Sequence, residues 1–141
     1  MEDIELARSL LEEKKLNLVI VKERQVLVSS KESGVAPFFR AVQKMETNLH
    51  NAALADRIVG LAVAMLCLHV RIASVYADIV SQVALDMLKN RGVTISSKSV
   101  VPHIFDYDGT DLCPFEKLAQ SCQEPSRLLT ALKSLFAEGG Q

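Results

Sequence analysis

The sequence predicts an α/β fold in which helices lie on both faces of a mixed sheet. Two observations indicate this class. Segments with helical periodicity alternate with short β-rich segments, and the first two β-rich segments lie close enough together to form a hairpin. The 141 residues suit a single domain, 1–141, and an apolar content of 49% is enough to build a core. We therefore expect a three-layer α/β/α sandwich.

The N-terminal part of the chain predicts a helix followed by a hairpin. Apolar residues recur at helical spacing over residues 4–11. Segments 16–21 and 25–30 are β-rich, and the polar residues 22–24 between them predict a three-residue connection.

Two further helices are expected before the middle of the chain. An apolar stripe over residues 35–45 predicts an amphipathic helix, and the polar residues 46–51 predict a loop. The chain is then rich in Ala, Leu and Val and apolar nearly all round over residues 52–68. This composition predicts a helix that is buried on several sides.

The second half of the chain predicts alternating strands and helices. A strand is centred on residues 72–77, and the next helix has Ser81 as its N-cap and ends at Gly92. Pro102 indicates that the following strand or pair of strands lies at an edge or is irregular. Proline at the first helical position predicts two C-terminal helices, which span 114–121 and 125–137.

Composition excludes several classes of protein. There are 16 Lys and Arg against 17 Asp and Glu, so no basic field would attract nucleic acid or an anionic membrane. The N-terminus carries acids where a signal peptide would carry bases, and the most apolar run is too short to span a bilayer. Three cysteines without disulfide-like spacing suggest reduced thiols. We expect a soluble, cytoplasmic protein without nucleic-acid or membrane partners.

Four segments of the chain carry a resemblance: "ADRIVGLAVAMLCL", "VYADIVSQVALDML", "VPHI" and "DGTDLCPFE". Together with the order of elements, they resemble a small prokaryotic family of uncharacterised proteins that is assigned a cytidine-deaminase-like fold. The resemblance runs from about residue 5 to residue 120. It implies a cytidine-deaminase-like sandwich more strongly than it implies an activity, because a fold does not determine its chemistry.

The sequence departs from the zinc deaminases of that superfamily. Those enzymes carry His/Cys-x-Glu on one helix and Pro-Cys-x-x-Cys at the start of the next. The corresponding segments here are "VGLAVAML" and "SQVALDML", which offer neither motif, and Ser81 stands where a thiolate would stand. We therefore expect no metal and no cofactor.

Cys113 admits two interpretations. With Pro114 as the first helical residue, Cys113 would be an N-cap, and the Glu116 side chain could accept from its backbone N–H. The exposed N–H groups of the same helix end would also lower the pKa of the thiol and make it reactive. In that case His103 or Glu116 would carry the proton.

Other polar residues are candidates for ligand binding. Asp56 and Arg57 are expected near the start of the apolar helix, where an adjacent acid and base need partners or a pocket. Asp78 and Ser81 follow a strand, and ligands in α/β sheets gather at the carboxyl ends of strands. Ser81 is also a good helix N-cap, and this is the explanation that we favour for it.

Glycine and the remaining acids have competing explanations as well. Gly60 within the expected helix suggests close packing or the close approach of a ligand. Asp111 belongs to an acidic turn, 106–111, which is typical of a solvated loop and lacks the pattern of a calcium loop.

Three hypotheses for function remain open. The first is a binding module whose cleft, without metal, holds a nucleotide-like or nucleoside-like small molecule. The second is a metal-independent enzyme that uses Cys113, and the third is a structural protein without catalysis. Because deaminase-like relatives commonly assemble, we expect a homo-oligomer under all three.

Overall fold

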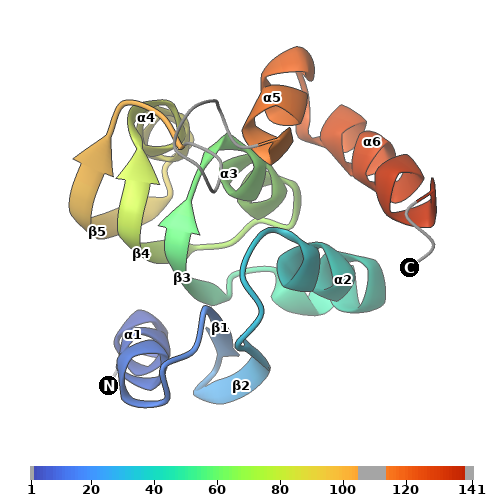
Figure 1. The fold of residues 1–141 in the computed structure, drawn as a ribbon. Helices are drawn as coiled ribbons and strands as arrows, with labels where there is room; N and C mark the ends of the chain where they lie inside the picture. The colour runs from blue at the N-terminus through green and yellow to red at the C-terminus, as the bar shows by residue number, and fades with distance from the viewer. Residues whose placement is uncertain (1, 105–113, 139–141) are drawn as a thin grey trace.

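The structure is a computed structural model that describes residues 2–104 and 114–138, and it contains a five-stranded sheet flanked by helices (Figure 1). The strands are β1 (Leu18–Lys22), β2 (Gln25–Ser30), β3 (Ala53–Val59), β4 (Ser74–Ser81) and β5 (Thr94–Val101). The helices are α1 (Asp3–Glu13), α2 (Ala36–Met45), α3 (Leu61–His69), α4 (Gln82–Asn90), α5 (Pro114–Ser121) and α6 (Pro125–Glu138), with a 3₁₀ turn η1 (Glu46–Leu49). These elements confirm the α/β class.

The sheet is mixed, as the sequence predicts. Its strand order is β2-β1-β3-β4-β5, with β1 antiparallel to both β2 and β3 and with β3, β4 and β5 parallel. The parallel connections pass through α3 and α4, which each follow a strand directly. β5 is an edge strand and ends just before Pro102, as expected from a residue that cannot donate to a ladder.

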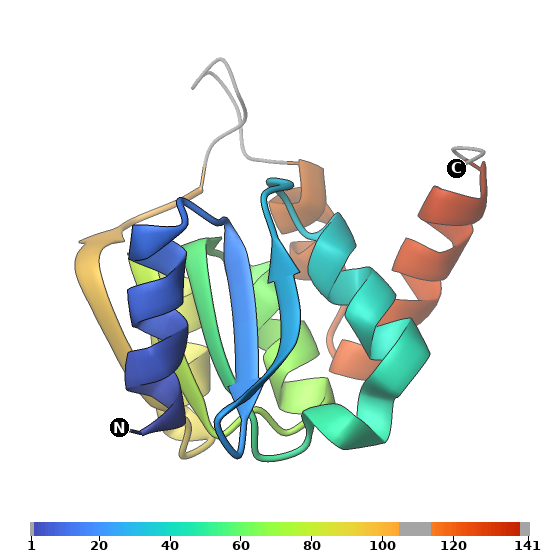
Figure 2. The same ribbon diagram turned by 90° about the horizontal axis from the view of Figure 1, so that it is seen from below.

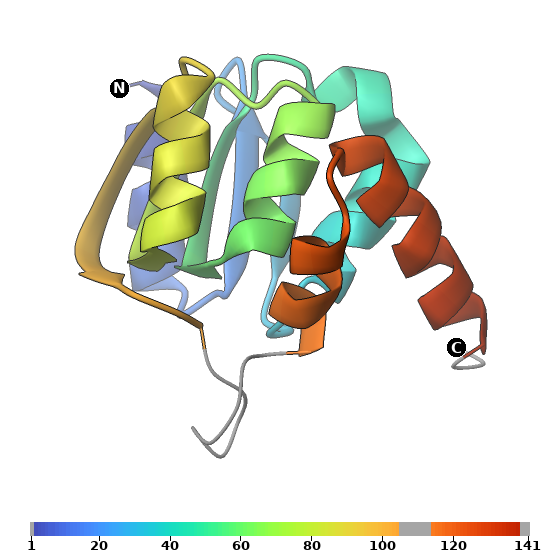
Figure 3. The same ribbon diagram turned by 90° about the horizontal axis from the view of Figure 1, so that it is seen from above.

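Helices cover both faces of the sheet. Figure 2 shows α1 in front of one face, and Figure 3 shows α3 and α4 in front of the other, with α5 and α6 beside α3. α3 packs against α2, α4, α5 and α6, and every residue from Leu61 to Cys67 is buried. The core has two parts: a small cluster under α1 and a large one on the α3 side.

The first hairpin has a shorter turn than the sequence suggests. Lys22 belongs to β1 and pairs with Gln25, so the connection is the two residues Glu23 and Arg24. Both have positive φ, 51° and 63°, which matches the twist of the flanking strands. The Asp3 carboxylate accepts hydrogen bonds from both backbone N–H groups at 2.9 Å, so the start of α1 holds this turn.

The expectation of one helix over residues 52–68 is wrong. This segment forms β3, then Gly60 as the N-cap of α3, and then α3 itself. A continuous apolar run has the same pattern in a buried strand and in a buried helix, so periodicity does not separate them. Here the backbone pairing of β3 with β1 and β4 overrides the helical preference of Ala and Leu.

The other elements follow the sequence more closely. The helix expected over 35–45 is α2, and part of the loop expected over 46–51 is the 3₁₀ turn. Ser81 is the N-cap of α4 and accepts a hydrogen bond from the Ala84 N–H at 3.3 Å. Gly92 follows the end of α4 with φ of 82°.

Candidate functional site

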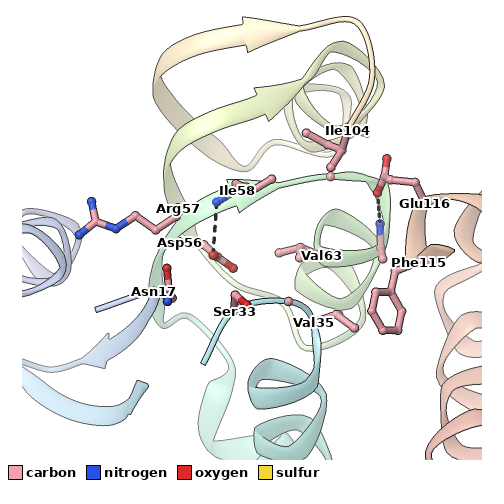
Figure 4. A pocket seen from close by; sticks show the side chains of 13 residues that line it. Asn17, Ser33, Val35, Asp56, Arg57, Ile58, Val63, Ile104, Phe115 and Glu116 are labelled. Atoms are coloured by element: carbon pink, nitrogen blue, oxygen red, sulfur yellow. Dashed lines mark hydrogen bonds between the residues drawn. The ribbon is translucent and has the colours of Figure 1, made fainter. Parts of the chain in front are cut away.

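A cavity of about 180 Å³ lies at the carboxyl end of β3 (Figure 4). Its walls come from the segment before α2, from β3, from the first turn of α3 and from the start of α5. The end of β3 and the start of α3 meet here because Gly60 turns the chain directly from strand to helix. The carboxyl ends of parallel strands are the usual place for ligands in α/β folds.

Two buried acids line this cavity. In the described part of the chain, the polar or charged residues that are buried are Asp56, Ser81 and Glu116. Asp56 and Glu116 border the cavity, whereas Ser81 is occupied in capping α4. Buried carboxyl groups are costly unless they are neutral or well paired, so their presence in one cavity marks it as the candidate site.

Asp56 lies on β3 and is 8% exposed. Its neighbours across the sheet are Leu18 on β1 and Ala77 on β4, both apolar. Its Oδ1 accepts a long hydrogen bond, 3.4 Å, from the Ile58 N–H. Burial raises the pKa of Asp56 to about 8, although backbone N–H groups and the charge of Arg57 oppose the rise. The carboxyl group is therefore mostly protonated at neutral pH.

Arg57 is the next residue, and its guanidinium points to the opposite face of the sheet, toward α1 (Figure 4). Successive side chains on a strand alternate between faces, so the Asp56 carboxyl group and the Arg57 guanidinium point to opposite faces of the sheet. The guanidinium donates to the carbonyl groups of Leu16 and Leu11 at 2.8 and 2.7 Å, and to Asp78 Oδ2 at 2.9 Å. Arg57 thus fastens α1 to the sheet.

Asp78 is part of the same network behind the sheet. Its Oδ1 accepts a hydrogen bond from the Tyr76 hydroxyl at 2.7 Å, and Lys98 lies 3.8 Å away. Burial alone would raise the pKa of Asp78, but the hydrogen bonds from Arg57 and Tyr76 and the nearby positive charges hold it below its usual value. Asp78 lies within β4 rather than after its end, and it does not border the cavity.

Glu116 reaches from α5 to the first turn of α3. Its Oε1 accepts a hydrogen bond from the Ala62 N–H at 3.3 Å. The Glu116 carboxylate thus lies at the N-terminus of α3, although Glu116 itself belongs to α5. Burial raises the pKa of Glu116, while the N–H groups of Ala62 and Leu61 and the charge of His103 oppose the rise. The sequence instead predicts the Cys113 N–H as the partner, which lies outside the described residues.

Gly60 allows this contact. A Cβ on Gly60 would collide with Oε1 of Glu116, and the backbone φ of −106° at this position is accessible to any residue. Of the two explanations that the sequence leaves open for this glycine, the structure shows close packing, and Gly60 lies at the N-cap of α3 and not within a helix.

The rest of the cavity wall is mainly apolar, with Val35, Ile58, Val63, Ile104 and Phe115 among the side chains in Figure 4. Phe115 stacks on Phe136 of α6, with ring centroids 6.1 Å apart, and this contact supports one wall.

Asn17 and Ser33 add polar groups that sequence reasoning missed. Both come from short connections beside β1 and α2, where a polar residue has no distinctive spacing.

The remaining predicted residues lie apart from the cavity or outside the described chain. His103 is exposed and its charge acts on Glu116. Cys113, Asp111 and the acidic turn 106–111 fall outside residues 2–104 and 114–138. Among the described residues, no group of three or more His, Cys, Asp or Glu side chains could hold a metal ion. In those same ranges, no helix has the length and apolar character to cross a membrane.

Comparison with known proteins identifies the family. No curated protein sequence matches the chain. A crystal structure of a DUF1893 family protein (TM1506) from Thermotoga maritima superposes with a TM-score of 0.84 and 26% sequence identity, covering 94% of this chain and 88% of the other. The family model TM1506, described as a domain of unknown function (DUF1893), matches residues 6–136. The chain therefore belongs to the DUF1893 family.

Proposed function

We propose that this protein binds a small, flat, uncharged ligand of the nucleoside or nucleobase class in the cavity at the end of β3, on a cytidine-deaminase-like fold that works without zinc. One observation carries the proposal. Asp56 places a buried carboxyl group against a cavity whose walls are mainly apolar. An apolar cavity with few polar groups is typical of sites that bind small organic molecules.

The size of the cavity limits the ligand. Pockets for drug-sized molecules measure roughly 300–1,000 Å³, whereas an apolar cavity of about 150 Å³ accommodates benzene. The volume of about 180 Å³ found here suits one heterocyclic ring. A ribose attached to that ring would extend toward the opening.

The arrangement of the elements supports the class of ligand. The order β2-β1-β3-β4-β5, with a hairpin first and parallel strands after it, is consistent with the resemblance to deaminase-like proteins. The helices α3 and α4 begin with "LAV" and "QVA", so neither first turn offers the residues that hold zinc in deaminases. We infer binding without the metal chemistry of that superfamily.

A metal-independent enzyme that uses Cys113 is the alternative of a different class. Glu116 would be a poor proton carrier for it, because its carboxylate is engaged with the first turn of α3. A purely structural homo-oligomer is the other alternative, and we propose self-association under each hypothesis. A melting temperature that rises with protein concentration would support self-association.

Thermal-shift assays with cytosine, uracil, cytidine and uridine test the proposal. Binding raises the melting temperature in proportion to the logarithm of ligand concentration above the dissociation constant. Ser33 borders the cavity and is exposed, so Ser33→Phe would obstruct it without disturbing the core. Ser134→Phe on the exposed surface of α6 is the matched control.

We expect at least one ligand to stabilise the wild type and the Ser134→Phe variant but not the Ser33→Phe variant. Equal stabilisation of all three proteins would place binding elsewhere. The absence of any shift, combined with a concentration-dependent melting temperature, would favour the structural alternative.

A further inference from the structure

We infer that Asp56 recognises its ligand as a neutral carboxylic acid, which donates one hydrogen bond and accepts another from the edge of a heterocycle that presents an acceptor beside a donor. This inference rests on the proposed function and names the chemistry of the ligand. Cytosine presents such an edge through its ring nitrogen and amino group, and uracil through its carbonyl and ring N–H.

The surroundings of Asp56 favour the neutral form. The side chain lies on the α3 side of the central strand β3, between Leu18 and Ala77. A buried carboxylate is stable when it accepts two or three good hydrogen bonds or pairs with a base. The bonds that Asp56 accepts are weak, because the one from the Ile58 N–H is 3.4 Å long and the Arg57 N–H, the second donor, also donates to the Asn17 carbonyl. The guanidinium of Arg57 is turned to the other face.

Apart from Arg57, the titratable groups near Asp56 do not favour its ionisation. Asp78 acts through the sheet from the α1 side, and its negative charge disfavours ionisation of Asp56. On the α3 side, Cys67 is buried with its pKa raised by burial and by Asp56 itself. Glu116 and His103 lie toward α5, where the charge of His103 is directed at Glu116. Burial, which raises the pKa of Asp56 to about 8, therefore prevails.

A neutral carboxyl group offers an O–H donor and a carbonyl acceptor side by side. This pair is complementary to an amidine or amide edge, and it is not complementary to a carboxylate or phosphate, which present acceptors alone. Among the described residues that line the cavity, Arg57 is the one base, and it is committed to Asp78. The site should therefore prefer a free base or nucleoside to a nucleotide.

Calorimetric titration with cytosine and with uracil between pH 6 and pH 9 tests the inference, because both free bases are uncharged over most of this range. The wild type should bind one or both. Its affinity should fall about tenfold from pH 7 to pH 9, as a group with a pKa of about 8 loses its proton.

Asp56→Asn keeps one donor and one acceptor in the same shape, so it should bind with no pH dependence over this range. Asp56→Leu removes both groups and should lose binding. Wild-type affinity that is independent of pH, or an Asp56→Asn variant that has lost binding although it is folded by circular dichroism, would overturn the inference and leave the proposed function standing. Failure of every base and nucleoside to bind the wild type at any pH would overturn both.

Discussion

Asp56 and Arg57 are neighbours in sequence, yet the sheet separates them. The carboxyl group of Asp56 faces the α3 side and is mostly protonated at neutral pH. The guanidinium of Arg57 faces α1 and donates hydrogen bonds to three oxygen atoms. Strand alternation produces this result, since consecutive side chains point to opposite faces. Asp56 therefore borders the cavity, whereas Arg57 holds α1 against the sheet.

The raised pKa of Asp56 has a consequence for stability. The native state holds a proton that the unfolded state releases above its ordinary pKa of 3.8. The free energy of unfolding should therefore fall as the pH rises from about 4 to 8, by an amount on the order of a few kcal/mol from this group.

Asp56→Asn should remove that contribution and be more stable than the wild type at pH 8. Urea denaturation of both proteins at pH 5 and pH 8 measures the difference. Equal pH dependence in the two proteins would show that Asp56 is not protonated in the folded state.

Gly60 and Glu116 should be energetically coupled. Gly60→Ala would displace the Glu116 carboxylate and remove the cap of α3, at a cost of about 1 kcal/mol. In a Glu116→Ala background the same substitution has no carboxylate to displace and should cost much less.

The double-mutant cycle, measured by urea denaturation, gives the coupling energy. Glu116→Gln is the matched control, because its carbonyl oxygen still accepts from the Ala62 N–H. Additive effects of the two alanine substitutions would mean that the carboxylate does not cap α3.

At the level of single residues, the sequence predicts local contacts and misses distant ones. Ser81 caps α4 as expected, because its partner is three residues away. The contact between Glu116 and Ala62 spans 54 positions, and no local pattern encodes it. Asn17 and Ser33 reach the cavity only because β1 lies beside β3 and the chain returns before α2.

Three helices end in the same way. After α1, α3 and α4, a residue with positive φ reverses the chain, and the following N–H bonds to a carbonyl five residues earlier at 2.9–3.0 Å. The reversing residues are Lys15 with φ of 52°, Arg71 with φ of 59°, and Gly92 with φ of 82°. This is the Schellman arrangement, in which glycine is the favoured residue.

Replacing a reversing residue by glycine should therefore stabilise the protein, and replacing a reversing glycine should destabilise it. Lys15→Gly should stabilise the protein by about 1 kcal/mol, because a side chain in the left-handed region is strained. Gly92→Ala should destabilise it by a similar amount, and through conformation alone, because an added Cβ meets no atom within 4 Å. Thermal melts measure both changes.

Lys15→Ala is the control for the loss of the lysine charge. It retains the Cβ and should leave stability nearly unchanged. If Lys15→Ala stabilised the protein as much as Lys15→Gly, charge and not backbone conformation would be the cause.

Most elements could be predicted from the sequence, and the exception is informative. The ends of α4 and the starts of α5 and α6 follow from Ser81, Gly92 and the two prolines, which act within a few residues. The sequence does not predict β3 as a strand, because β3 is a central strand that is covered on both faces. Both faces therefore favour apolar side chains, and the alternation typical of a half-buried strand is missing. Pairing with distant strands decided its conformation, and that information is absent from the segment itself.

On the scale of the whole molecule, α3 is the centre of the packing on its side of the sheet. The sheet and four helices surround it, and Cys67 near its end is fully buried. Burial raises the pKa of this thiol, so it should react with thiol reagents only when α3 is exposed. Exposure of α3 requires the layers to separate, which amounts to global unfolding.

A variant with Cys113→Ser and Cys122→Ser leaves Cys67 as the single thiol. The free energy of opening, obtained from its labelling rate with iodoacetamide, should equal the free energy of unfolding from urea denaturation. Rapid labelling under native conditions would instead show that α3 opens locally.

The cap on α3 also dictates an order of events during synthesis. The five strands of the described sheet precede α5 in the chain, so a ribosome delivers them before it delivers Glu116. In that interval the first turn of α3 has unsatisfied N–H groups, and its outer apolar surface lacks the cover of α5 and α6. The nascent protein thus stays exposed to aggregation and to chaperones until α5 and α6 emerge, and the cavity at the end of β3 gains its α5 wall only then.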